Sequence, residues 1–426
     1  FERSKAARDA GFLVNAGVQG GRYLDLREKA AKALGAKFPL VAVGGIVPLM
    51  ESYRFKELVD VIATVKKNIP ANTLVHAFGL GHPMVFGLAC ALGCDFFDSA
   101  AYALYAQDDR YLTSYGTVHL EDLRYVGCLC PVCREYGLGL KNLFGRERVE
   151  KLAYHNLFVS YAELAHIKQA VSCGRLWDYL ATRCRAHPAL FEGFLALEKH
   201  MPWLMGLDPA TKNCGLFYTG VDTSFRAEVL NARQRLKRVE SDEKIDHPVF
   251  GPIPSGLMEF YPFGQSVLGG GFERNIHVND LVKLRQMADY QFGEGAGALI
   301  PDNVVIKKSR KTKRIRWVYH HRGLFLTVRA SDHFLLPKNP YAIRLHEYFK
   351  YPRLRVKLTD DEQATQCVRE GKSVMCKFVE DVDENLLCRD ECLVVDSNDN
   401  LIRVGTLHLS PKEIMDFDSG MAVRVR

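Results

Sequence analysis

Residues 93–133 read GCDFFDSAAYALYAQDDRYLTSYGTVHLEDLRYVGCLCPVC, and this stretch decides the fold. It begins as a short apolar run that ends in a carboxylate, Asp98, which is the pattern of a buried strand with a polar end. It finishes with three closely spaced cysteines, Cys128, Cys130 and Cys133. We therefore expect a reactive group at a strand end and, further along the chain, a metal knuckle.

The residues before and within this stretch alternate between short apolar runs and amphipathic helical patterns. Strands are predicted at residues 12–19, 39–47, 73–79 and 94–100, with helices at residues 21–34, 53–67 and 84–92. The strands are apolar with little alternation, as in a parallel sheet that is buried on both faces. The repeated βα order predicts an α/β fold, either half of an eight-stranded (β/α)8 barrel of the TIM type or an open doubly wound sheet.

The composition changes along the chain and divides it into domains. We expect residues 1–206 to hold the α/β part with a zinc subdomain at residues 127–160, and apolar spacing of three and four predicts a helix over residues 152–171. Residues 207–285, rich in Gly, Pro and aromatic residues, are interpreted as a linker α+β domain, and residues 286–350 as a basic α+β domain. Residues 352–426 predict a small β-barrel, in which SNDN at 397–400 forms a hairpin turn.

The bulk properties exclude several classes of protein. A length of 426 residues suggests about two to four domains. The apolar runs are too short, and too often interrupted by Gly and Pro, to span a bilayer. With no evident signal sequence, the 12 cysteines predict reduced thiols and metal ligands in a cytoplasmic protein rather than disulfides. The net charge of +7 is only mildly basic, so the distribution of charge says more about a nucleic-acid partner.

The three cysteines form a C-x-C-x-x-C motif, which suits tetrahedral zinc if a fourth ligand is present. His155 is one candidate, and spacing alone leaves Glu163 and His166 open. Three thiolates and one imidazole would fill all four positions, so the site would be structural. The alternative is a set of buried cysteines without a metal.

Asp98 has two interpretations. A carboxylate at the end of an apolar strand, followed by small residues, can face a pocket and act as a nucleophile or general base. It can equally cap the next helix, and spacing alone slightly favours the cap. By strand alternation, Asp95 is expected on the opposite face.

Glycine-rich segments follow the other predicted strands as VQGG, VGGIV and FGLGHP. Their backbone groups can hydrogen-bond the edge of a planar heterocycle, Gln19 adds an amide that donates and accepts, and Phe78 offers a stacking face. The alternative for each segment is a tight turn that requires glycine. None has the phosphate-loop pattern G-x-x-x-x-G-K-[ST].

A basic run interleaved with aromatic residues follows residue 306. Such a pattern favours contact with a nucleic-acid backbone, with Trp317 and Tyr319 available for stacking. The alternative is a solvated hairpin edge, where Lys discourages aggregation. The cations of the run are Lys307, Lys308, Arg310, Lys311, Lys313, Arg314 and Arg316.

Together these motifs resemble the archaeal tRNA-guanine transglycosylases of the archaeosine type. The resemblance covers essentially the whole chain and is most specific in VGGIVPLMESYRF, HAFGLGHP, FFDSAAYALYAQDDRY and CLCPVC with LAYHNL. It implies a (β/α)8 barrel, of which the second half is present, and a C-terminal PUA domain that binds RNA. It also implies a nucleophile at Asp98 and a base-binding set of Gln19, Gly44, Gly45, Ile46 and Phe78. The implied ligands of one structural zinc are Cys128, Cys130, Cys133 and His155.

The resemblance implies exchange of guanine in the tRNA D-loop, at position 15, for 7-cyano-7-deazaguanine through a covalent Asp98–ribose intermediate. It further implies a homodimer. The family's second catalytic aspartate, in a DSGSFQ-like segment, and its first barrel strands have no counterpart here. We therefore expect an N-terminally truncated chain, or a partner chain that supplies the first half-barrel, and no activity from this fragment alone. The alternatives are an archaeosine synthase-like paralogue and a non-catalytic tRNA-binding subunit.

Overall fold

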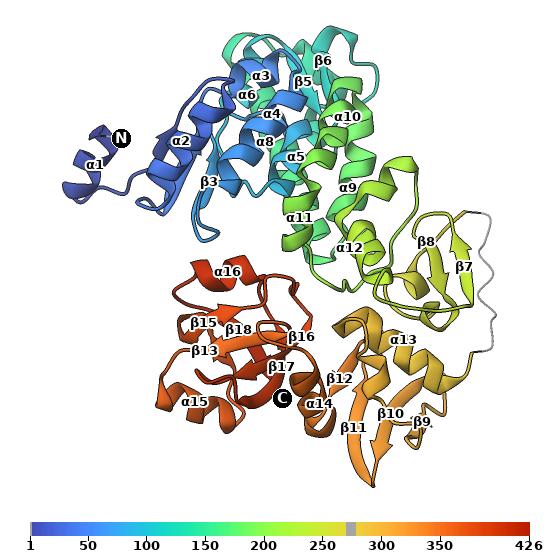
Figure 1. The fold of residues 1–426 in the computed structure, drawn as a ribbon. Coiled ribbons are helices and arrows are strands. Elements are labelled where there is room, and N and C mark those ends of the chain that lie inside the picture. Colours follow the sequence, from blue (N-terminus) through green and yellow to red (C-terminus); the bar gives the residue numbers. More distant parts are fainter. Residues whose placement is uncertain (1, 270–277) are drawn as a thin grey trace. The chain divides into compact units, whose positions relative to one another are not determined.

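A computed structural model describes residues 2–269 and 278–426 (Figure 1). Phe1, which belongs to a helical pattern in the sequence, and residues 270–277 of the predicted linker domain lie outside the described residues. The chain divides into two compact units, Phe1–His200 and Met201–Arg426, and each is described by itself.

The first unit is built on a four-stranded parallel sheet in the order β1-β2-β3-β4. Each strand lies within one of the four predicted runs, and a helix follows each of the first three, so the predicted βα order is confirmed. The strands are β1 (Ala16–Val18), β2 (Leu40–Val43), β3 (Leu74–Ala77) and β4 (Phe96–Phe97). The helices up to β4 are α1 (Glu2–Asp9), α2 (Leu24–Gly35), α3 (Val47–Glu51), α4 (Phe55–Lys67) and α5 (Phe86–Ala91).

The two faces of this sheet differ. On one face, the side chains of Val41, Val43 and Val75 are fully buried, and α2 packs against β1 and β2 on the way between them. The opposite face exposes large apolar side chains, among them Leu74 at 42% and Phe96 at 49%. The expectation of burial on both faces is therefore wrong for the described residues, because within this unit helices cover only one side.

The chain after β4 forms a mostly helical region that carries the cysteine motif. A two-stranded antiparallel hairpin, β5 and β6, comes before the motif, and the long helix α8 follows it. The helix predicted over residues 152–171 is confirmed within α8. The elements are α6 (Ala101–Gln107), β5 (Arg110–Thr113), β6 (Gly116–His119), α7 (Pro131–Tyr136), α8 (Gly145–Ser172), α9 (Leu176–Arg183) and α10 (Pro188–Leu195).

The second unit begins with helices and a short hairpin and continues into a four-stranded antiparallel sheet in the order β12-β11-β10-β9. The basic run of the sequence covers the end of β9, the turn after it and the start of β10. The elements of this part are α11 (Met201–Leu207), α12 (Ala227–Leu236), β7 (Lys244–His247), β8 (Gly251–Pro254), α13 (Asp280–Phe292), β9 (Val305–Lys308), β10 (Ile315–His320), β11 (Gly323–Val328), β12 (Leu335–Pro337) and α14 (Asn339–Tyr348).

The chain ends in a mixed six-stranded sheet in the order β14-β18-β17-β16-β13-β15. β16 and β17 pair antiparallel across the SNDN segment, which confirms the predicted hairpin. One apolar core extends from Leu216 to Val425, so the four-stranded and six-stranded sheets of this unit share it. The elements are β13 (Arg355–Leu358), α15 (Glu362–Arg369), β14 (Val374–Met375), β15 (Val379–Val382), β16 (Glu391–Val395), β17 (Leu401–Leu407), α16 (Pro411–Asp416) and β18 (Met421–Val425).

Candidate active site and metal centre

The predicted base-binding and reactive residues gather at one edge of the parallel sheet. Gln19 follows β1, Gly44 follows β2, Phe78 follows β3 and Asp98 follows β4. Since the four strands run in the same direction, all these positions lie at their carboxyl ends. This is the edge at which parallel α/β folds carry their ligand sites.

Asp98 is exposed and is held through a single oxygen. Its Oδ1 accepts hydrogen bonds from the backbone N–H of Gly79 at 2.6 Å and from Nε2 of His76 at 2.8 Å. Gly79 has a φ of +74°, and a Cβ there would lie 2.5 Å from Val47 Cγ2, so only glycine fits this turn. Asp98 does not cap α6, because the N-cap residue is Ala100 and the side chain that accepts from the N–H of Ala101 at the helix start is the Ser99 hydroxyl.

The neighbouring carboxylate, Asp95, is bound differently. Its Oδ2 accepts from the N–H of Val75 at 2.8 Å, near the start of β3, whereas Asp98 is bound near the end of that strand. Asp95 therefore fastens β4 to β3 away from the edge where the predicted site residues gather.

The sequence patterns did not predict two residues of the Asp98 cluster, His76 and Asn15. His76 lies on β3, and its Nδ1 is 2.7 Å from the amide nitrogen of Asn15, just before β1. No local motif marks either residue, and they are 61 positions apart. The available signal was the strand register, because His76 precedes Phe78 by two residues and so shares its face of the sheet.

Gln19 and the GG turn lie in contact. A Cβ at Gly44 would be 2.2 Å from Gln19 Nε2, so the glutamine amide occupies the space that a side chain would need. The backbone N–H of Gly44 donates to the carbonyl of Val18 at 3.2 Å, which ties the two turns together. The side chain of Ile46 is fully buried and its carbonyl caps α3, so this residue can offer a ligand only its N–H.

A buried arginine holds the VQGG turn in place through hydrogen bonds. Arg27 of α2 is fully buried and donates to the carbonyls of Val18 at 2.7 Å and Gly21 at 2.9 Å. Burial lowers the pKa of its guanidinium from the ordinary value. The guanidinium thus fixes the carbonyls at both ends of the VQGG turn, while the side chain of Gln19 between them is exposed.

Phe78 offers an exposed aromatic face beside the carboxylate. Its side chain is 51% exposed, and its ring meets the His76 ring edge to face at 5.4 Å. A ring that exposes half of its surface next to a polar cluster can stack on a planar heterocycle.

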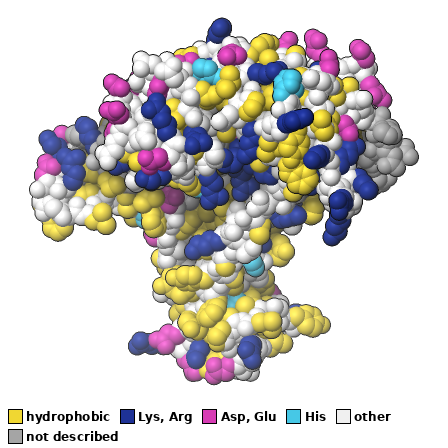
Figure 2. Space-filling view, turned by 90° about the horizontal axis from the view of Figure 1, so that it is seen from below, with side chains coloured by type: hydrophobic (Ala, Val, Ile, Leu, Met, Phe, Trp, Pro, Cys, Tyr) yellow, Lys and Arg dark blue, Asp and Glu magenta, His cyan; other side chains and the backbone are white. Residues whose placement is uncertain are grey.

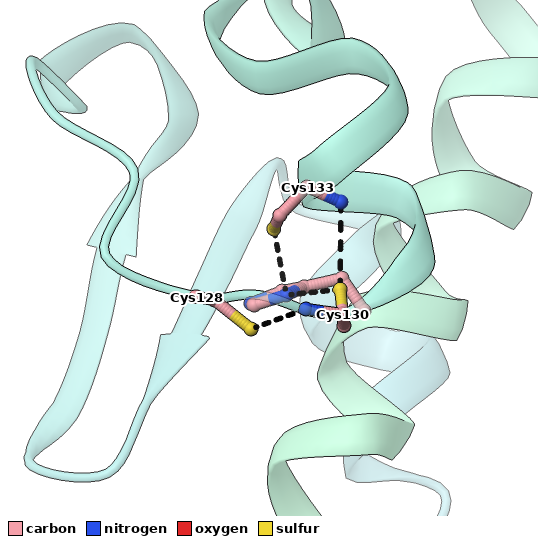
Figure 3. Close-up of side chains that lie close together, drawn as sticks. Cys128, Cys130 and Cys133 are labelled. Atoms are coloured by element: carbon pink, nitrogen blue, oxygen red, sulfur yellow. Dashed lines mark hydrogen bonds between the residues drawn. The ribbon is translucent and has the colours of Figure 1, made fainter.

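The cysteine motif forms a compact cluster with His155. The three sulfurs and one nitrogen of His155 all lie within 4.8 Å of one another (Figure 3). Nδ1 of His155 is 3.5 Å from Sγ of Cys130 and 3.3 Å from Sγ of Cys133. Tetrahedral coordination with bonds of about 2.3 Å to sulfur and 2.0 Å to nitrogen places ligand atoms at similar separations. The group can therefore hold one metal ion.

The surroundings prepare His155 as a ligand. Its Nε2 is 2.9 Å from the carbonyl of Leu112, which accepts a hydrogen bond from Nε2–H and so leaves the lone pair of Nδ1 for a metal. Tyr111 stacks on the imidazole at 3.7 Å, and its hydroxyl is 3.1 Å from Sγ of Cys133. Burial lowers the pKa of His155 to about 4 and raises that of Cys133 to about 12, so without a cation both groups are neutral near pH 7.

The other two candidates for the fourth ligand lie outside this cluster. Glu163 is buried in an ion pair with Arg183, and His166 is exposed on α8. Next to His155, Asn156 accepts from the N–H of Leu112 and donates to the carbonyls of Tyr102 and Arg110, so it joins α8 to α6 and β5. Asn156 was also missed in the sequence, because its role depends on contacts far along the chain.

The basic run lies on the exposed β9–β10 hairpin, in the turn and the strand ends beside it. Six of its seven cations are exposed, and Arg316 is half-buried. Lys308 pairs with Asp280 at 2.7 Å, while Lys307 lies 4.8 Å from the centre of the Tyr319 ring. Figure 2 shows Lys and Arg side chains among exposed hydrophobic ones on the face that it presents. Exposed cations beside an aromatic ring can contact a phosphate backbone.

Three family models match the chain. "Queuine tRNA-ribosyltransferase" matches residues 1–189, "Patch-forming domain C2 of tRNA-guanine transglycosylase" matches residues 282–352, and "PUA domain" matches residues 357–426. Within residues 2–269 and 278–426, no helix has the length and apolarity required to cross a bilayer.

Curated relatives match over the whole chain. Proteins named tRNA-guanine(15) transglycosylase from Thermococcus onnurineus and Pyrococcus furiosus are 42% and 41% identical over 100% of this chain, which spans 74% and 73% of their lengths. The protein of that name from Methanocaldococcus jannaschii is 37% identical over 100% of this chain and 77% of its own length. A solved structure of a hypothetical protein from Pyrococcus horikoshii matches 34% of this chain and 88% of its own at 20% identity, with a TM-score of 0.29 that is too low to inform the fold.

Proposed function

The chain belongs to the tRNA-guanine transglycosylase family, and on this premise we propose that it exchanges guanine at position 15 of the tRNA D-loop for 7-cyano-7-deazaguanine, as a cytoplasmic step towards archaeosine. The observation that carries the proposal is the Asp98 carboxylate, anchored through Oδ1 at the carboxyl edge of the sheet. Gln19, Gly44 and Phe78 lie at the same edge.

In the proposed reaction, Oδ2 of Asp98 attacks the anomeric carbon of the ribose as the bond to guanine breaks. A covalent enzyme–tRNA intermediate forms, and the incoming base then displaces the carboxylate. Two inversions at the same carbon retain the configuration. Guanine gains the proton at its glycosidic nitrogen that the incoming base gives up, so the exchange needs no net proton and no nucleotide hydrolysis.

Recognition of the base is assigned to the turns beside Asp98. The Gln19 amide and the backbone groups of Gly44, Gly45 and Ile46 would read the edge of the heterocycle, while Phe78 would cover its face. The target nucleotide must leave its stack, which costs a few kcal/mol. The exposed cations of the basic turn and the PUA domain would offset this cost by holding the tRNA backbone.

We assign the Cys128, Cys130, Cys133 and His155 cluster to one structural Zn²⁺. Three thiolates and one imidazole suit Zn²⁺ and would leave no position for water, so the ion would hold the fold rather than take part in base exchange. The backbone N–H of Cys133 already donates to Sγ of Cys130, and that of Cys130 to Sγ of Cys128, which are contacts that stabilise thiolates.

The exposed face of the sheet supports a larger barrel. Apolar side chains such as Leu74, Phe78 and Phe96 are about half exposed on the face that also carries His76, where the interior of a (β/α)8 barrel would lie. We propose that further β/α units, from the same polypeptide or a partner chain, cover this face and contribute the second carboxylate. Residues 1–426 alone would then be inactive.

Exposed apolar side chains also surround the cysteine cluster and support a homodimer contact there. Tyr125 is 89% exposed, Leu129 82% and Phe144 79%. Large apolar side chains left in water at this density are typical of protein interfaces.

The test uses the complete enzyme with labelled guanine and tRNA. Asp98→Asn, which keeps the shape of the side chain but not its charge, is expected to lower the exchange rate by at least about 10³-fold. Wild-type enzyme stopped during turnover should show a covalent tRNA complex by mass spectrometry, and the variant should not. Exchange by Asp98→Asn at the wild-type rate would refute the nucleophile. Tight tRNA binding without exchange, in wild-type enzyme with its barrel complete, would instead indicate a tRNA-binding subunit.

A further inference from the structure

We infer that Asn15 and His76 form a positioning relay that fixes one oxygen of Asp98 and leaves the other free to attack. The inference rests on the proposed role of Asp98 as nucleophile. It identifies the hydrogen bonds that orient the carboxylate. Neither the family models nor the names of the relatives assign a role to Asn15 or His76.

The hydrogen bonds determine where the imidazole carries its proton. The amide nitrogen of Asn15 can only donate, and it lies 2.7 Å from Nδ1 of His76, so Nδ1 is the acceptor. The ring is then neutral, with its proton on Nε2. Nε2 lies 2.8 Å from Oδ1 of Asp98 and donates to it. Protons therefore point along the relay from Asn15 to His76 and from His76 to Asp98.

The relay separates the two carboxylate oxygens. Oδ1 receives two donors, Nε2–H of His76 and N–H of Gly79, and among the described residues no protein partner is recorded for Oδ2. Two donors on one oxygen fix the carboxylate plane and hence the direction in which Oδ2 points. The Asp98 side chain is 48% exposed, so these two hydrogen bonds, rather than burial, supply its orientation.

A neutral donor suits a nucleophile better than a cation would. A hydrogen bond from neutral imidazole orients the carboxylate without the full opposite charge of an imidazolium, which would stabilise the free carboxylate against attack. Asn15 has this effect because its amide offers Nδ1 a donor, whereas a carboxylate at the same place would favour the charged ring.

The sheet leaves room for the relay. In the strand register, Gly17 of β1 and Ala42 of β2 lie level with His76 of β3. Neither carries more than a methyl group on this face, so the side chain of Asn15 can reach across β2 to the imidazole. On the other side, the His76 ring packs edge to face against Phe78 at 5.4 Å. The ring is thus fixed from two directions, and its side chain is only 13% exposed.

The kinetic test compares three variants of the complete enzyme. His76→Phe keeps a ring but loses the donor, and is expected to lower kcat about 10²-fold while KM for tRNA changes less than about twofold, as for a misdirected reacting group. His76→Gln can still donate an N–H to Asp98 and should recover about tenfold of that loss. His166→Gln, the same substitution at an exposed position of α8, should leave kcat unchanged.

A spectroscopic test examines the relay without relying on activity. ¹⁵N chemical shifts of His76 in the wild-type enzyme should show a neutral ring protonated at Nε2. Asn15→Asp, which replaces the donor with an acceptor, should move a proton to Nδ1, and Asn15→Leu should leave the tautomer unconstrained. An Nδ1–H tautomer in the wild type, or equal kcat for His76→Phe and wild type, would overturn the relay.

The two proposals fail in different ways. If Asp98→Asn abolishes exchange and His76→Phe does not, the nucleophile stands and the relay is wrong. If Asp98→Asn exchanges guanine normally, the proposed function is wrong. The ¹⁵N measurement still decides whether Asn15 keeps the His76 proton on Nε2.

Discussion

The Asp98 cluster and the cysteine cluster are both short motifs fixed by backbone N–H groups, but they differ in what they leave open. Asp98 is exposed, and one of its two oxygens holds both recorded hydrogen bonds. In the cysteine cluster, three of four residues are buried and their four ligand atoms face one another. An oxygen left open to solvent suits a reacting group, whereas a closed set of donors suits a structural ion.

The largest expected effect is on stability, and it should follow loss of a cysteine but not loss of the Asp98 charge. Cys133→Ser removes one of the four proposed metal ligands and is expected to destabilise the first unit by about 3 kcal/mol or more, because metal binding and folding are coupled. For a unit of this size that lowers Tm by roughly 10 °C. Asp98→Asn should leave Tm within about 1 °C, because the side chain is exposed. Differential scanning calorimetry and metal analysis of both variants provide the measurement.

Similar behaviour of the two variants would contradict different roles for the two clusters. A fall in Tm for Asp98→Asn as large as that for Cys133→Ser would give Asp98 a structural role. Full metal content and an unchanged Tm in Cys133→Ser would show that Cys133 is not a ligand, and wild-type protein without metal would show that the cluster holds no ion.

The pH dependence of metal binding provides the second test. Burial raises the pKa of Cys133 to about 12 and also raises that of Cys128, so without a metal both are thiols near pH 7. The pKa of His155 is about 4, so its ring is already neutral and releases no proton. Zn²⁺ must displace at least two protons, and its affinity should rise about 100-fold per pH unit between pH 6 and 8. Competition with a chromogenic chelator measures this slope, and a slope near zero would exclude thiolate ligation.

The sequence predicted the regions whose structure depends on local pattern. Buried strands and amphipathic helices repeat within a few residues, so the βα order and α8 were visible without contacts. C-x-C-x-x-C is equally local, because the spacing itself brings three sulfurs together. The choice of His155 over Glu163 and His166 was not local, since it depends on how α8 packs against β5.

The rest of the candidate site depended on strand register. His76 and Asn15 meet only because β1, β2 and β3 lie in a particular alignment and the residues between them are small. The preference for Asp98 as a cap failed for a related reason. The donor that reaches its carboxylate belongs to Gly79 in the turn after β3, and it is the Ser99 hydroxyl that accepts from the first N–H of α6. The exposure of one face of the sheet could not be predicted either, because an apolar strand has the same sequence pattern whether one face or both faces are covered.

A smaller effect tests whether the GG turn belongs to the open site. Gly44→Ala would place a Cβ 2.2 Å from Gln19 Nε2 and so displace the amide, and we expect KM for the incoming base to rise about 10- to 100-fold. Gly17→Ala is the matched control, because its Cβ would lie at an ordinary 3.5 Å from the same atom. Steady-state kinetics with varied base concentration compare the two. Equal KM values would remove Gln19 from base recognition.

The smallest effect concerns the basic turn, which contributes charge without the fixed geometry of either cluster. Lys311 and Lys313 are exposed, and each is expected to neutralise one phosphate. Replacing either with Ala should weaken tRNA binding about threefold and reduce the slope of log Kd against log salt concentration by about one, while kcat stays unchanged. Lys29→Ala, the same loss of charge at an exposed position of α2, should alter neither quantity. Filter binding at several salt concentrations gives the slopes. If Lys311→Ala and Lys29→Ala shift the slope equally, the basic turn acts only through net charge and makes no local contact with the tRNA backbone.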